Sequence, residues 1–317
     1  MEKIKLDKKD KKLLSYIFHN FREPITKIAK KCMISREQAE YRIKKYEEKG
    51  LIKKYLVFFD LYSLGYNKNY IIKLRVKNPN IDKLSQIKTN EGILIFTRVQ
   101  CYGAWDYILT VLTKETLNIL DFISDLYELW KENLLDYDIF EPIELHYFPL
   151  KIFGVNKEEN KLSLYETEKK KIDELDKKII HEISKNAKIK IINIANNIHE
   201  KVETVNYRLK KLKKNIILGY RILLDLNKID YKLVQLVLKL NNLSKSNKNK
   251  ILTYGSRREN IHAVGIGVGK YNTIFQIIYK TPSELVEEIN EIKETFSENL
   301  VEYELIHIEN ELSPKTI

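Results

Sequence analysis

Two stretches of the chain carry the same arrangement of basic and aromatic side chains. In both, a Tyr-Arg pair is followed after one residue by two lysines. Guanidinium and ammonium groups clustered in this way neutralise phosphate oxygens, and such contacts set the affinity and register of a protein on nucleic acid. The residues that we interpret as phosphate contacts are Arg42, Lys44, Lys45, Arg208, Lys210 and Lys211.

A structural role for Arg42 and Arg208 is an equally open alternative. Each arginine follows a tyrosine that we expect to face the core, and an arginine stem beside such a residue often packs along it. In that case each guanidinium would pair with a neighbouring carboxylate or a helix end, and the lysines alone would remain for phosphates.

The residues around the start of each basic stretch are candidates for contacts with bases. We expect them on a helix that enters the major groove, where the N-terminal half of the helix meets base edges. These candidates are Ser35, Arg36, Gln38, Glu40, Thr204 and Asn206.

No arrangement typical of an enzyme accompanies these residues. The six histidines occur singly without metal-ligand spacing, Cys32 and Cys101 lack a partner, and no Gly-x-Ser-x-Gly motif occurs. Gly265-x-Gly267-x-Gly269 leads from one predicted strand into another, whereas a phosphate cradle requires a helix N-terminus. We therefore expect no catalytic residue, no metal and no cofactor, and we interpret the protein as not an enzyme.

The matched residues recur because the chain repeats itself with a shift of 166 residues. Asp10-Lys11-Lys12 aligns with Asp176-Lys177-Lys178. Residues 1–55 hold 17 basic and 8 acidic side chains and residues 169–221 hold 15 and 6, whereas the rest of the chain is net acidic. A basic excess confined to two matched modules indicates a polyanionic partner.

The elements that carry these residues form a helix-turn-helix in each basic module. Apolar residues recur at helical spacing, a three-residue turn lies between the last two helices, and Ser35 is a suitable N-cap. The segment after each third helix is rich in β-branched and aromatic residues and predicts a strand, as a wing or as a connecting ribbon. The predicted helices are 8–20, 24–32 and 36–49, repeated as 173–185, 190–197 and 202–214.

Each basic module is followed by the order strand, helix, strand, strand, helix, strand, which is ferredoxin-like. In the helix 115–131 we expect Leu120 and Tyr127 among the inward residues. The sheet face opposite the helices must find a partner, so we expect the two modules to pair within one chain. The remaining elements are predicted at 70–76, 80–90, 93–100, 106–112 and 139–147, then at 233–240, 245–254, 261–268, 271–279, 282–296 and 300–308.

The pattern of the first half resembles the Lrp/AsnC (leucine-responsive, feast/famine) regulators. The residues that carry the resemblance are Asp10, Leu14, Ile28-Ala29, Ser35, Tyr41-Arg42-Ile43, Gly50-Leu51-Ile52, Tyr55 and Asp60. The resemblance implies a winged helix-turn-helix domain, and a ferredoxin-like domain that dimerises and senses a small effector.

The resemblance also implies an effector site at the turn between the second and third strands of each ferredoxin-like module. Asn272 lacks the carboxylate of Asp106, which weakens an amino-group contact in the second copy. A structural turn without a ligand is an equally open alternative. The implied effector residues are Gly103, Trp105, Asp106, Gly269, Tyr271 and Asn272.

The fold class that follows is α+β, with two winged helix-turn-helix domains alternating with two ferredoxin-like βαββαβ domains. With only two cysteines and no apolar run of about 18 residues, we expect a cytoplasmic protein without a membrane partner. The predicted domains are 1–66, 67–150, 172–231 and 232–317, with a linker at 151–171.

The predicted function is sequence-specific binding of double-stranded DNA by a transcriptional regulator that acts as an intramolecular pseudo-dimer, modulated by an amino acid or similar effector. Higher homo-oligomers are left open. One alternative is a sirohaem-decarboxylase-like enzyme, for which His146 and His262 are the candidates in a porphyrin pocket. Another is a chromatin-like DNA-coating protein of low specificity.

Overall fold

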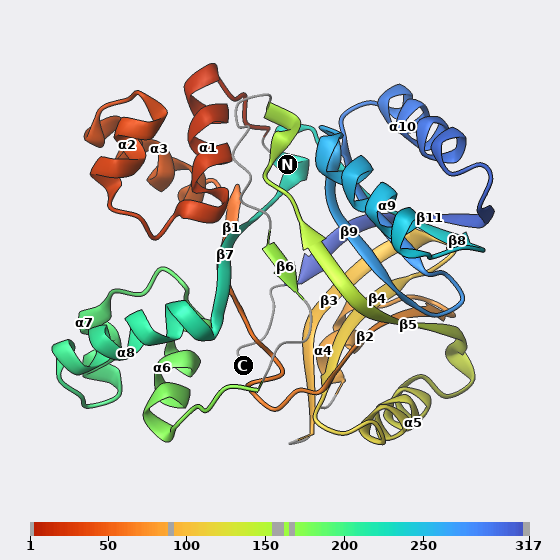
Figure 1. Ribbon diagram of the computed structural model, residues 1–317, viewed down its shortest axis with the longest axis horizontal. Coiled ribbons are helices and arrows are strands. Elements are labelled where there is room, and N and C mark those ends of the chain that lie inside the picture. Colours follow the sequence, from red (N-terminus) through yellow and green to blue (C-terminus); the bar gives the residue numbers. More distant parts are fainter. Residues whose placement is uncertain (1–2, 88–91, 154–161, 165–168, 313–317) are drawn as a thin grey trace. The chain divides into compact units, whose positions relative to one another are not determined.

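The computed structural model describes residues 3–87, 92–153, 162–164 and 169–312 of the chain (Figure 1). The chain divides into two compact units. Unit 1 is built from residues 1–64 and 147–231, and unit 2 from residues 65–146 and 232–315. None of the helices in these described segments is long and apolar enough to cross a membrane.

Unit 1 contains two three-helix heads, each followed by a strand, as the sequence predicts. We call them head 1 and head 2. Head 1 comprises α1 (Lys8–Asn20), α2 (Ile25–Cys32), α3 (Arg36–Glu48) and β1 (Ile52–Phe59). Head 2 comprises α6 (Glu174–Lys185), α7 (Ile191–Asn197), α8 (Val202–Asn215) and β7 (Ile217–Leu224).

Local signals fix the ends of these helices. The Asp7 side chain accepts a hydrogen bond from the Asp10 amide and completes a capping box at the start of α1. The helix-turn-helix turn holds a residue in the left-handed region in both heads, Met33 with φ 57° and His199 with φ 56°. The left-handed residue therefore occupies the matching position in the two turns.

The strands β1 and β7 form an antiparallel two-stranded ribbon between the heads (Figure 1). Val57 lies opposite Tyr220 in this ribbon. Of the wing and the connecting ribbon that the sequence left open, the structure has the ribbon. Each head contributes one strand to it, so neither head forms a β-pair by itself.

Unit 2 contains two βαββαβ modules. The first module is β2 (Lys68–Val76), α4 (Ile81–Gln86), β3 (Ile93–Gly103), β4 (Tyr107–Thr113), α5 (Asn118–Trp130) and β5 (Leu134–Tyr147). The second module is β8 (Lys232–Leu240), α9 (Lys245–Arg257), β9 (Ile261–Val268), β10 (Thr273–Tyr279), α10 (Pro282–Thr295) and β11 (Leu300–Leu312). The other short elements are the 3-10 turns 131–133, 151–153 and 226–229 and the strand β6 (Leu162–Leu164).

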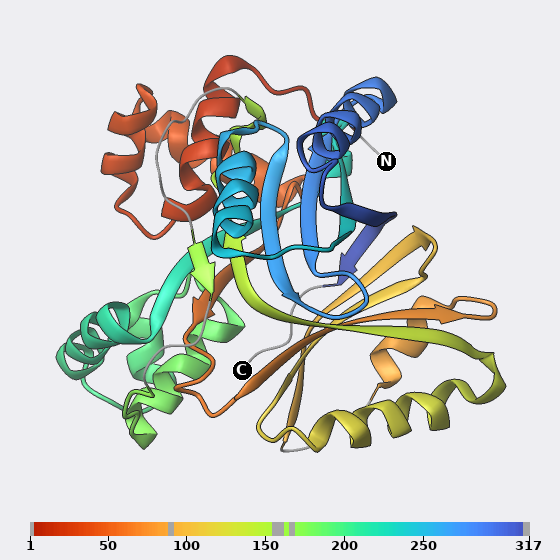
Figure 2. The ribbon, with the colours of Figure 1, turned by 45° about the vertical axis from the view of Figure 1, so that its right-hand side comes forward.

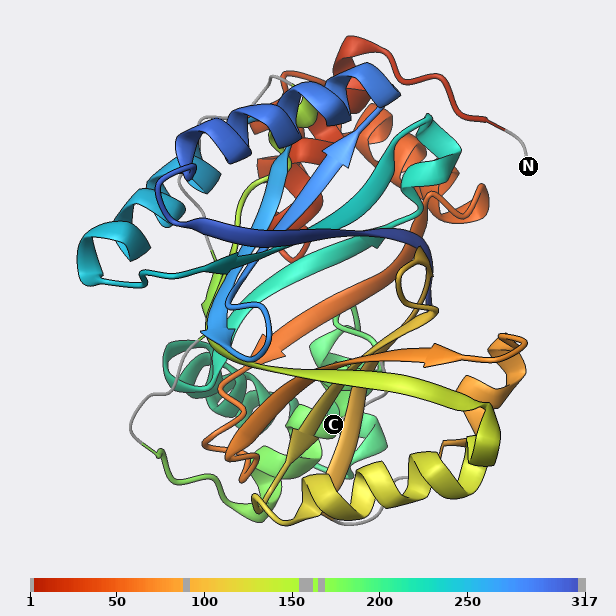
Figure 3. The ribbon, with the colours of Figure 1, turned by 90° about the vertical axis from the view of Figure 1, so that its right-hand side faces the viewer.

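The strand order is the same in both modules, β3-β4-β2-β5 and β9-β10-β8-β11. The last strand of each module is longer than predicted: β5 begins earlier, where it pairs with β2 of its own module, and β11 ends later, where it pairs with β3 of the other module. In β11, Ile306 pairs with Gly103 and Leu312 with Arg98 of β3, while the second half of β5 continues beside β9. Figures 2 and 3 show these two long strands running across both modules.

The prediction for the inward face of α5 was wrong at two positions. Leu120 is 65% exposed and Tyr127 is 50% exposed, whereas Phe122 is fully buried. The helix lies on one side of its sheet, so the buried residues follow a single stripe that includes Phe122, Ile123 and Leu126. Leu120 and Tyr127 lie beside that stripe on the helix surface and not within it.

The glycine run of the second module allows β5 to approach β9 closely. A Cβ added at Gly269 would lie 2.7 Å from the carbonyl oxygen of Ile139, and one added at Gly267 would overlap the carbonyl oxygen of Glu141. These glycines, at every second position, present one face to β5. They are therefore a packing device, consistent with the sequence argument against a phosphate cradle.

We expect Gly267→Val to lower the free energy of unfolding of unit 2 by about 3 kcal/mol, because β5 must move away from β9. Urea unfolding followed by circular dichroism measures this. The control is Val268→Ala, one residue away and 65% exposed, which should change stability by less than about 0.5 kcal/mol. Equal losses in both variants would contradict the close-approach argument.

Candidate nucleic-acid interface

The third helix of head 1 is capped and oriented by its first residues. The Ser35 side chain accepts a hydrogen bond from the Gln38 amide at 3.1 Å, so Ser35 is the N-cap of α3. Ala39 and Tyr46 are buried and hold the helix against the head. Because these two positions are seven residues apart, they define one inward stripe, and the opposite face of α3 is exposed.

The structure places the predicted base-contact residues on or near this exposed face. Arg36, Gln38 and Glu40 are exposed, and Arg36 Nε lies 2.9 Å from Glu40 Oε1. In head 2, Thr204 and Asn206 are half-buried on α8. The two heads therefore present different side chains at corresponding positions, since Gln38 and Glu40 of head 1 correspond to Thr204 and Asn206 of head 2.

Arg42 is held by carboxylates at the start of α1. Its Nη2 lies 2.9 Å from Asp7 Oδ2, and its Nη1 donates to Asp10, which also accepts a hydrogen bond from the Tyr46 hydroxyl. Burial disfavours the charged guanidinium, but the two carboxylates outweigh it and raise the pKa of Arg42. The hydrogen bond from the Asp10 amide and then that from Arg42 lower the pKa of Asp7. This network ties α3 to α1.

Head 2 repeats the network without the tyrosine. Arg208 Nη1 pairs with Asp173 and lies 3.5 Å from Asp176 Oδ1, and Leu212 replaces the hydroxyl-bearing residue. The hydrogen bond to Asp173 raises the pKa of Arg208. Of the two roles left open by the sequence, these contacts support the structural one for Arg42 and Arg208.

The lysines that follow remain available at the surface. Lys44, Lys45, Lys210 and Lys211 are exposed. Lys44 lies 3.6 Å from Glu48, whereas no carboxylate of the described residues pairs with the other three. Exposed ammonium groups at the side of a helix-turn-helix are suited to phosphate contacts.

Two exposed tyrosines were missed by the sequence analysis, which expected them in the core. Tyr41 is 68% exposed and Tyr207 is 69% exposed, at matching positions of α3 and α8. Neither hydroxyl has a hydrogen-bond partner among the described residues. The signal that could have found them is the spacing of Ala39 and Tyr46, which places position 41 on the outer face.

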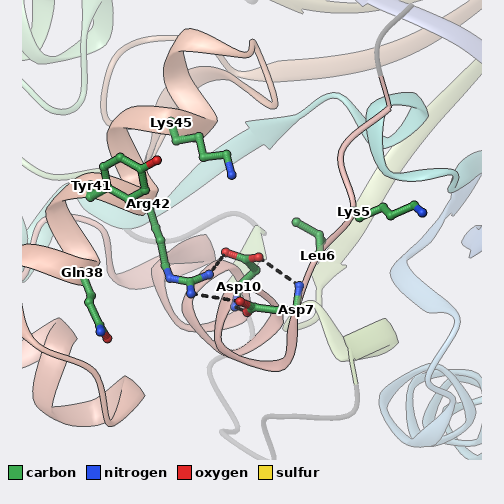
Figure 4. Close-up of a pocket in the computed structure, with 8 residues that line it drawn as sticks. All are labelled: Lys5, Leu6, Asp7, Asp10, Gln38, Tyr41, Arg42 and Lys45. Atoms are coloured by element: carbon green, nitrogen blue, oxygen red, sulfur yellow. Dashed lines mark hydrogen bonds and ion pairs between the residues drawn. The ribbon is translucent and has the colours of Figure 1, made fainter.

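A shallow cleft of about 580 Å³ lies between α3 and the segment before α1. Figure 4 shows Arg42 joined to Asp7 and Asp10 in this cleft, with Lys45 and Tyr41 beside each other on α3. The 166-residue shift gives residues of similar type at most of the same positions in head 2. The lining residues are Lys5, Leu6, Asp7, Asp10, Gln38, Tyr41, Arg42 and Lys45, and their counterparts are Lys171, Ile172, Asp173, Asp176, Thr204, Tyr207, Arg208 and Lys211.

The residues implied as an effector site have structural contacts in both modules. Asp106 accepts a hydrogen bond from the Val76 amide at 2.8 Å, and Asn272 exchanges two hydrogen bonds with the Leu240 backbone. Trp105 and Tyr271 are buried. Gly103, with φ 117°, and Gly269 lie where a last strand passes. Effector binding at these turns stays a prediction.

The two histidines of the enzyme alternative lie on the neighbouring strands β5 and β9. Both imidazoles are buried, and His146 Nε2 lies 3.3 Å from Glu144, which also pairs with Lys248. Within the described segments, no three His, Cys, Asp or Glu side chains are arranged to hold a metal ion.

We expect Arg42→Ala to lower the free energy of unfolding at pH 7 by about 1–3 kcal/mol, because Asp7 and Asp10 lose their ion-pair partner. The pKa of Asp7 is lower in the folded state, so its contribution to stability is present above about pH 4 and is lost as the pH falls. The difference from wild type should therefore shrink in acid. Denaturant unfolding at several pH values measures it, with Lys44→Ala as control, and a difference that stays constant down to pH 2 would contradict the network.

Comparison with known proteins identifies the family. A family described as winged helix-turn-helix DNA-binding matches residues 6–53 and again residues 172–215. The chain is 26% identical to the HTH-type transcriptional regulator LrpA of Pyrococcus horikoshii over 122 residues, which are 38% of this chain and 84% of LrpA. It is 33% identical to the uncharacterized HTH-type transcriptional regulator PH1916 of the same organism over 124 residues, 38% of this chain and 81% of that protein.

A solved structure shows that the whole arrangement occurs elsewhere. The crystal structure of the siroheme decarboxylase NirDL shares the fold over 97% of this chain and 92% of its own, with a TM-score of 0.60 and 14% identity. At that identity the likeness concerns the fold alone, whereas the regulators are similar in sequence. The chain therefore belongs to the Lrp/AsnC family of helix-turn-helix transcriptional regulators, in a form duplicated in tandem within one chain.

Proposed function

We propose that the protein is a sequence-specific DNA-binding regulator that places two different heads on one double-stranded site. The observation that carries the proposal is that both exposed, lysine-bearing recognition helices belong to one compact unit. A dimer of single-copy chains presents two identical heads, whereas this chain presents two that differ. The operator that fits it is an imperfect palindrome with half-sites about one or two helical turns apart.

Contacts between the heads support a fixed spacing. Arg22 of head 1 donates to the backbone carbonyls of Ala187 and Ile189 in head 2, the second at 3.3 Å. Lys188 of head 2 pairs with Glu47 of head 1. Together with the β1–β7 ribbon, these contacts tie the supporting turns of the two heads to each other.

We assign the DNA contacts to exposed and half-buried side chains of the two helices. Arg36, Gln38, Glu40, Thr204 and Asn206 would meet bases. Arg42 and Arg208 would act as positioning residues that hold α3 and α8. Phosphate contacts would come from Lys44, Lys45, Lys210 and Lys211, to which we add the hydroxyl groups of Tyr41 and Tyr207.

The intramolecular pseudo-dimer is part of the same proposal. It takes the domains as 1–66, 67–150, 172–231 and 232–317, so that heads and ferredoxin-like modules alternate along the chain. The pairing of β11 with β3 supports it, because one copy's last strand completes the other copy's sheet. Control by an amino acid or similar effector, and a cytoplasmic setting, belong to the proposal on the ground of family membership.

The proposal is tested by salt-dependent binding to DNA. We expect binding to the DNA upstream of its own gene to exceed binding to a random duplex of equal length by several hundredfold. Lys45→Ala and Lys211→Ala should each reduce the slope of log K against log salt by about 1. Lys68→Ala, in unit 2, is the control and should leave the slope unchanged. Steep salt dependence without sequence preference would instead favour a DNA-coating protein.

The exposed tyrosines give a separate prediction. Tyr41→Ala and Tyr207→Ala should each weaken specific binding about tenfold, which is about 1.4 kcal/mol, and leave the unfolding midpoint unchanged because both side chains are exposed. Tyr303→Ala, an exposed tyrosine of unit 2, is the matched control for filter binding or fluorescence anisotropy. Full affinity in both head variants would remove the tyrosines from the proposed interface.

An enzyme acting on an iron porphyrin is the second candidate, and its support is the fold shared with NirDL. The discriminating measurement is the Soret absorbance after an iron porphyrin is added to the protein. A stoichiometric shift of the Soret band, together with no DNA binding tighter than about 10⁻⁴ M, would replace the regulator by this enzyme.

A further inference from the structure

The two modules of unit 2 meet in an apolar cluster with an unequal set of polar neighbours. Trp105 from the first module and Tyr271 and Val237 from the second are buried together in this cluster. The polar groups around it come from both modules, but a buried ammonium group comes from the first module only.

That ammonium group belongs to Lys73 of β2, whose side chain is 3% exposed. Its Nζ lies 2.6 Å from Asp138 Oδ2. It also lies 4.7 Å from the ring centroid of Tyr271 and 5.2 Å from that of Trp105. A desolvated ammonium between two aromatic rings and beside a carboxylate is held by ion pairing and by the negative ring faces. Lys73 therefore contacts both modules.

The second module contributes two carboxylates but no buried ammonium, because its own neighbouring lysine, Lys270, is half-exposed and lies 3.5 Å from Glu302. The Tyr271 hydroxyl donates to Glu304 at 2.8 Å and to Glu302 at 3.0 Å, and Trp105 Nε1 also donates to Glu304. Glu304 thus accepts hydrogen bonds from an aromatic residue of each module.

The internal repeat shows which of these residues correspond. Trp105 corresponds to Tyr271 and Asp138 to Glu304, by the same shift of 166 residues. Strand register gives the partner of the lysine: Lys73 lies opposite Ile108, and Val237 lies opposite Ile274, which is the counterpart of Ile108. Position 73 therefore corresponds to position 237, where the second copy has valine.

We propose that the two modules are complementary halves, so that each accepts the unlike module of the same chain and rejects a like module of a second copy. The inference rests on the intramolecular pseudo-dimer proposed above. Two first modules would place two copies of Lys73 where the cluster has one lysine and one valine, so that two ammonium groups would repel each other. They would also place two copies of Trp105 where the cluster has one tryptophan and one tyrosine, which overfills the space. Two second modules would bring two copies of Glu304 together without a buried cation and leave the volume of the Lys73 side chain empty.

The test moves the lysine from one copy to the other in the full chain. Val237→Lys alone places two ammonium groups in one cluster and should lower the thermal midpoint of unit 2 by about 5 °C or more. Lys73→Val alone should also lower it, because Asp138 loses its partner. The double variant Lys73→Val/Val237→Lys restores one ammonium, now beside Glu304, and should recover at least half of the loss seen in Val237→Lys.

The control for introducing a lysine is Val268→Lys, at an exposed position, which should leave the midpoint unchanged. Losses in the double variant that equal the sum of the two single losses would overturn the proposal. If Val237→Lys does not fold, folding of the double variant is the expected rescue, and failure of both to fold would equally overturn it.

A second measurement separates this inference from the pseudo-dimer on which it rests. Pairing within one chain makes the wild-type midpoint independent of protein concentration, whereas pairing between chains makes it rise with concentration. A concentration-dependent midpoint with rescue in the double variant would refute the intramolecular arrangement and keep the complementarity. A midpoint that is independent of concentration, without rescue in the double variant, would keep the intramolecular arrangement and refute the complementarity.

Discussion

The last strand of each ferredoxin-like module pairs with two partners, and unit 2 depends on that sharing. β5 pairs with β2 and continues beside β9, and β11 pairs with β8 and then with β3. Neither module satisfies the full backbone of its final strand alone, because Ile306–Leu312 of β11 pair with β3 and the second half of β5 lies beside β9. Removing one module would leave an exposed strand edge in the other, which is a site of aggregation. The hydrogen bonding of the sheet therefore requires strands from both copies of the module.

In unit 1, the basic side chains have two different roles, ion pairing within a head and exposure to solvent, and the sequence alone does not distinguish them. The guanidinium groups of Arg42 and Arg208 are used inside the heads, where partly buried carboxylates hold them. The lysines at the following positions stay in solvent, where an ammonium on a flexible stem can adapt to a phosphate. A cluster of basic residues on a helix therefore does not show by itself which of them bind a ligand. That depends on which of them pair with acidic residues of neighbouring helices.

The features that sequence predicted well are those fixed by local interactions. α1 begins at Lys8 and ends at Asn20 as expected, because its capping residues and apolar spacing lie within the helix itself. The face of α5 and the exposure of Tyr41 were wrong, because tyrosine and leucine fit either side of an amphipathic helix and only the packed neighbours decide. The reach of β11 to Leu312 and the purpose of Gly267 depend on strands that are more than a hundred residues away in the chain, so no local pattern could reveal them.

The unlike recognition helices, joined by one ribbon, have a consequence for how a gene would be arranged around its operator. A protein with two identical heads binds a palindrome equally well in either direction, so the bound complex has no front or back. Here α3 and α8 carry different exposed side chains at matching positions, and an operator that distinguishes them is occupied in one direction only. The complex then has a polarity along the duplex. Each head, encoded by its own half of the gene, is free to diverge with its half-site without changing the other.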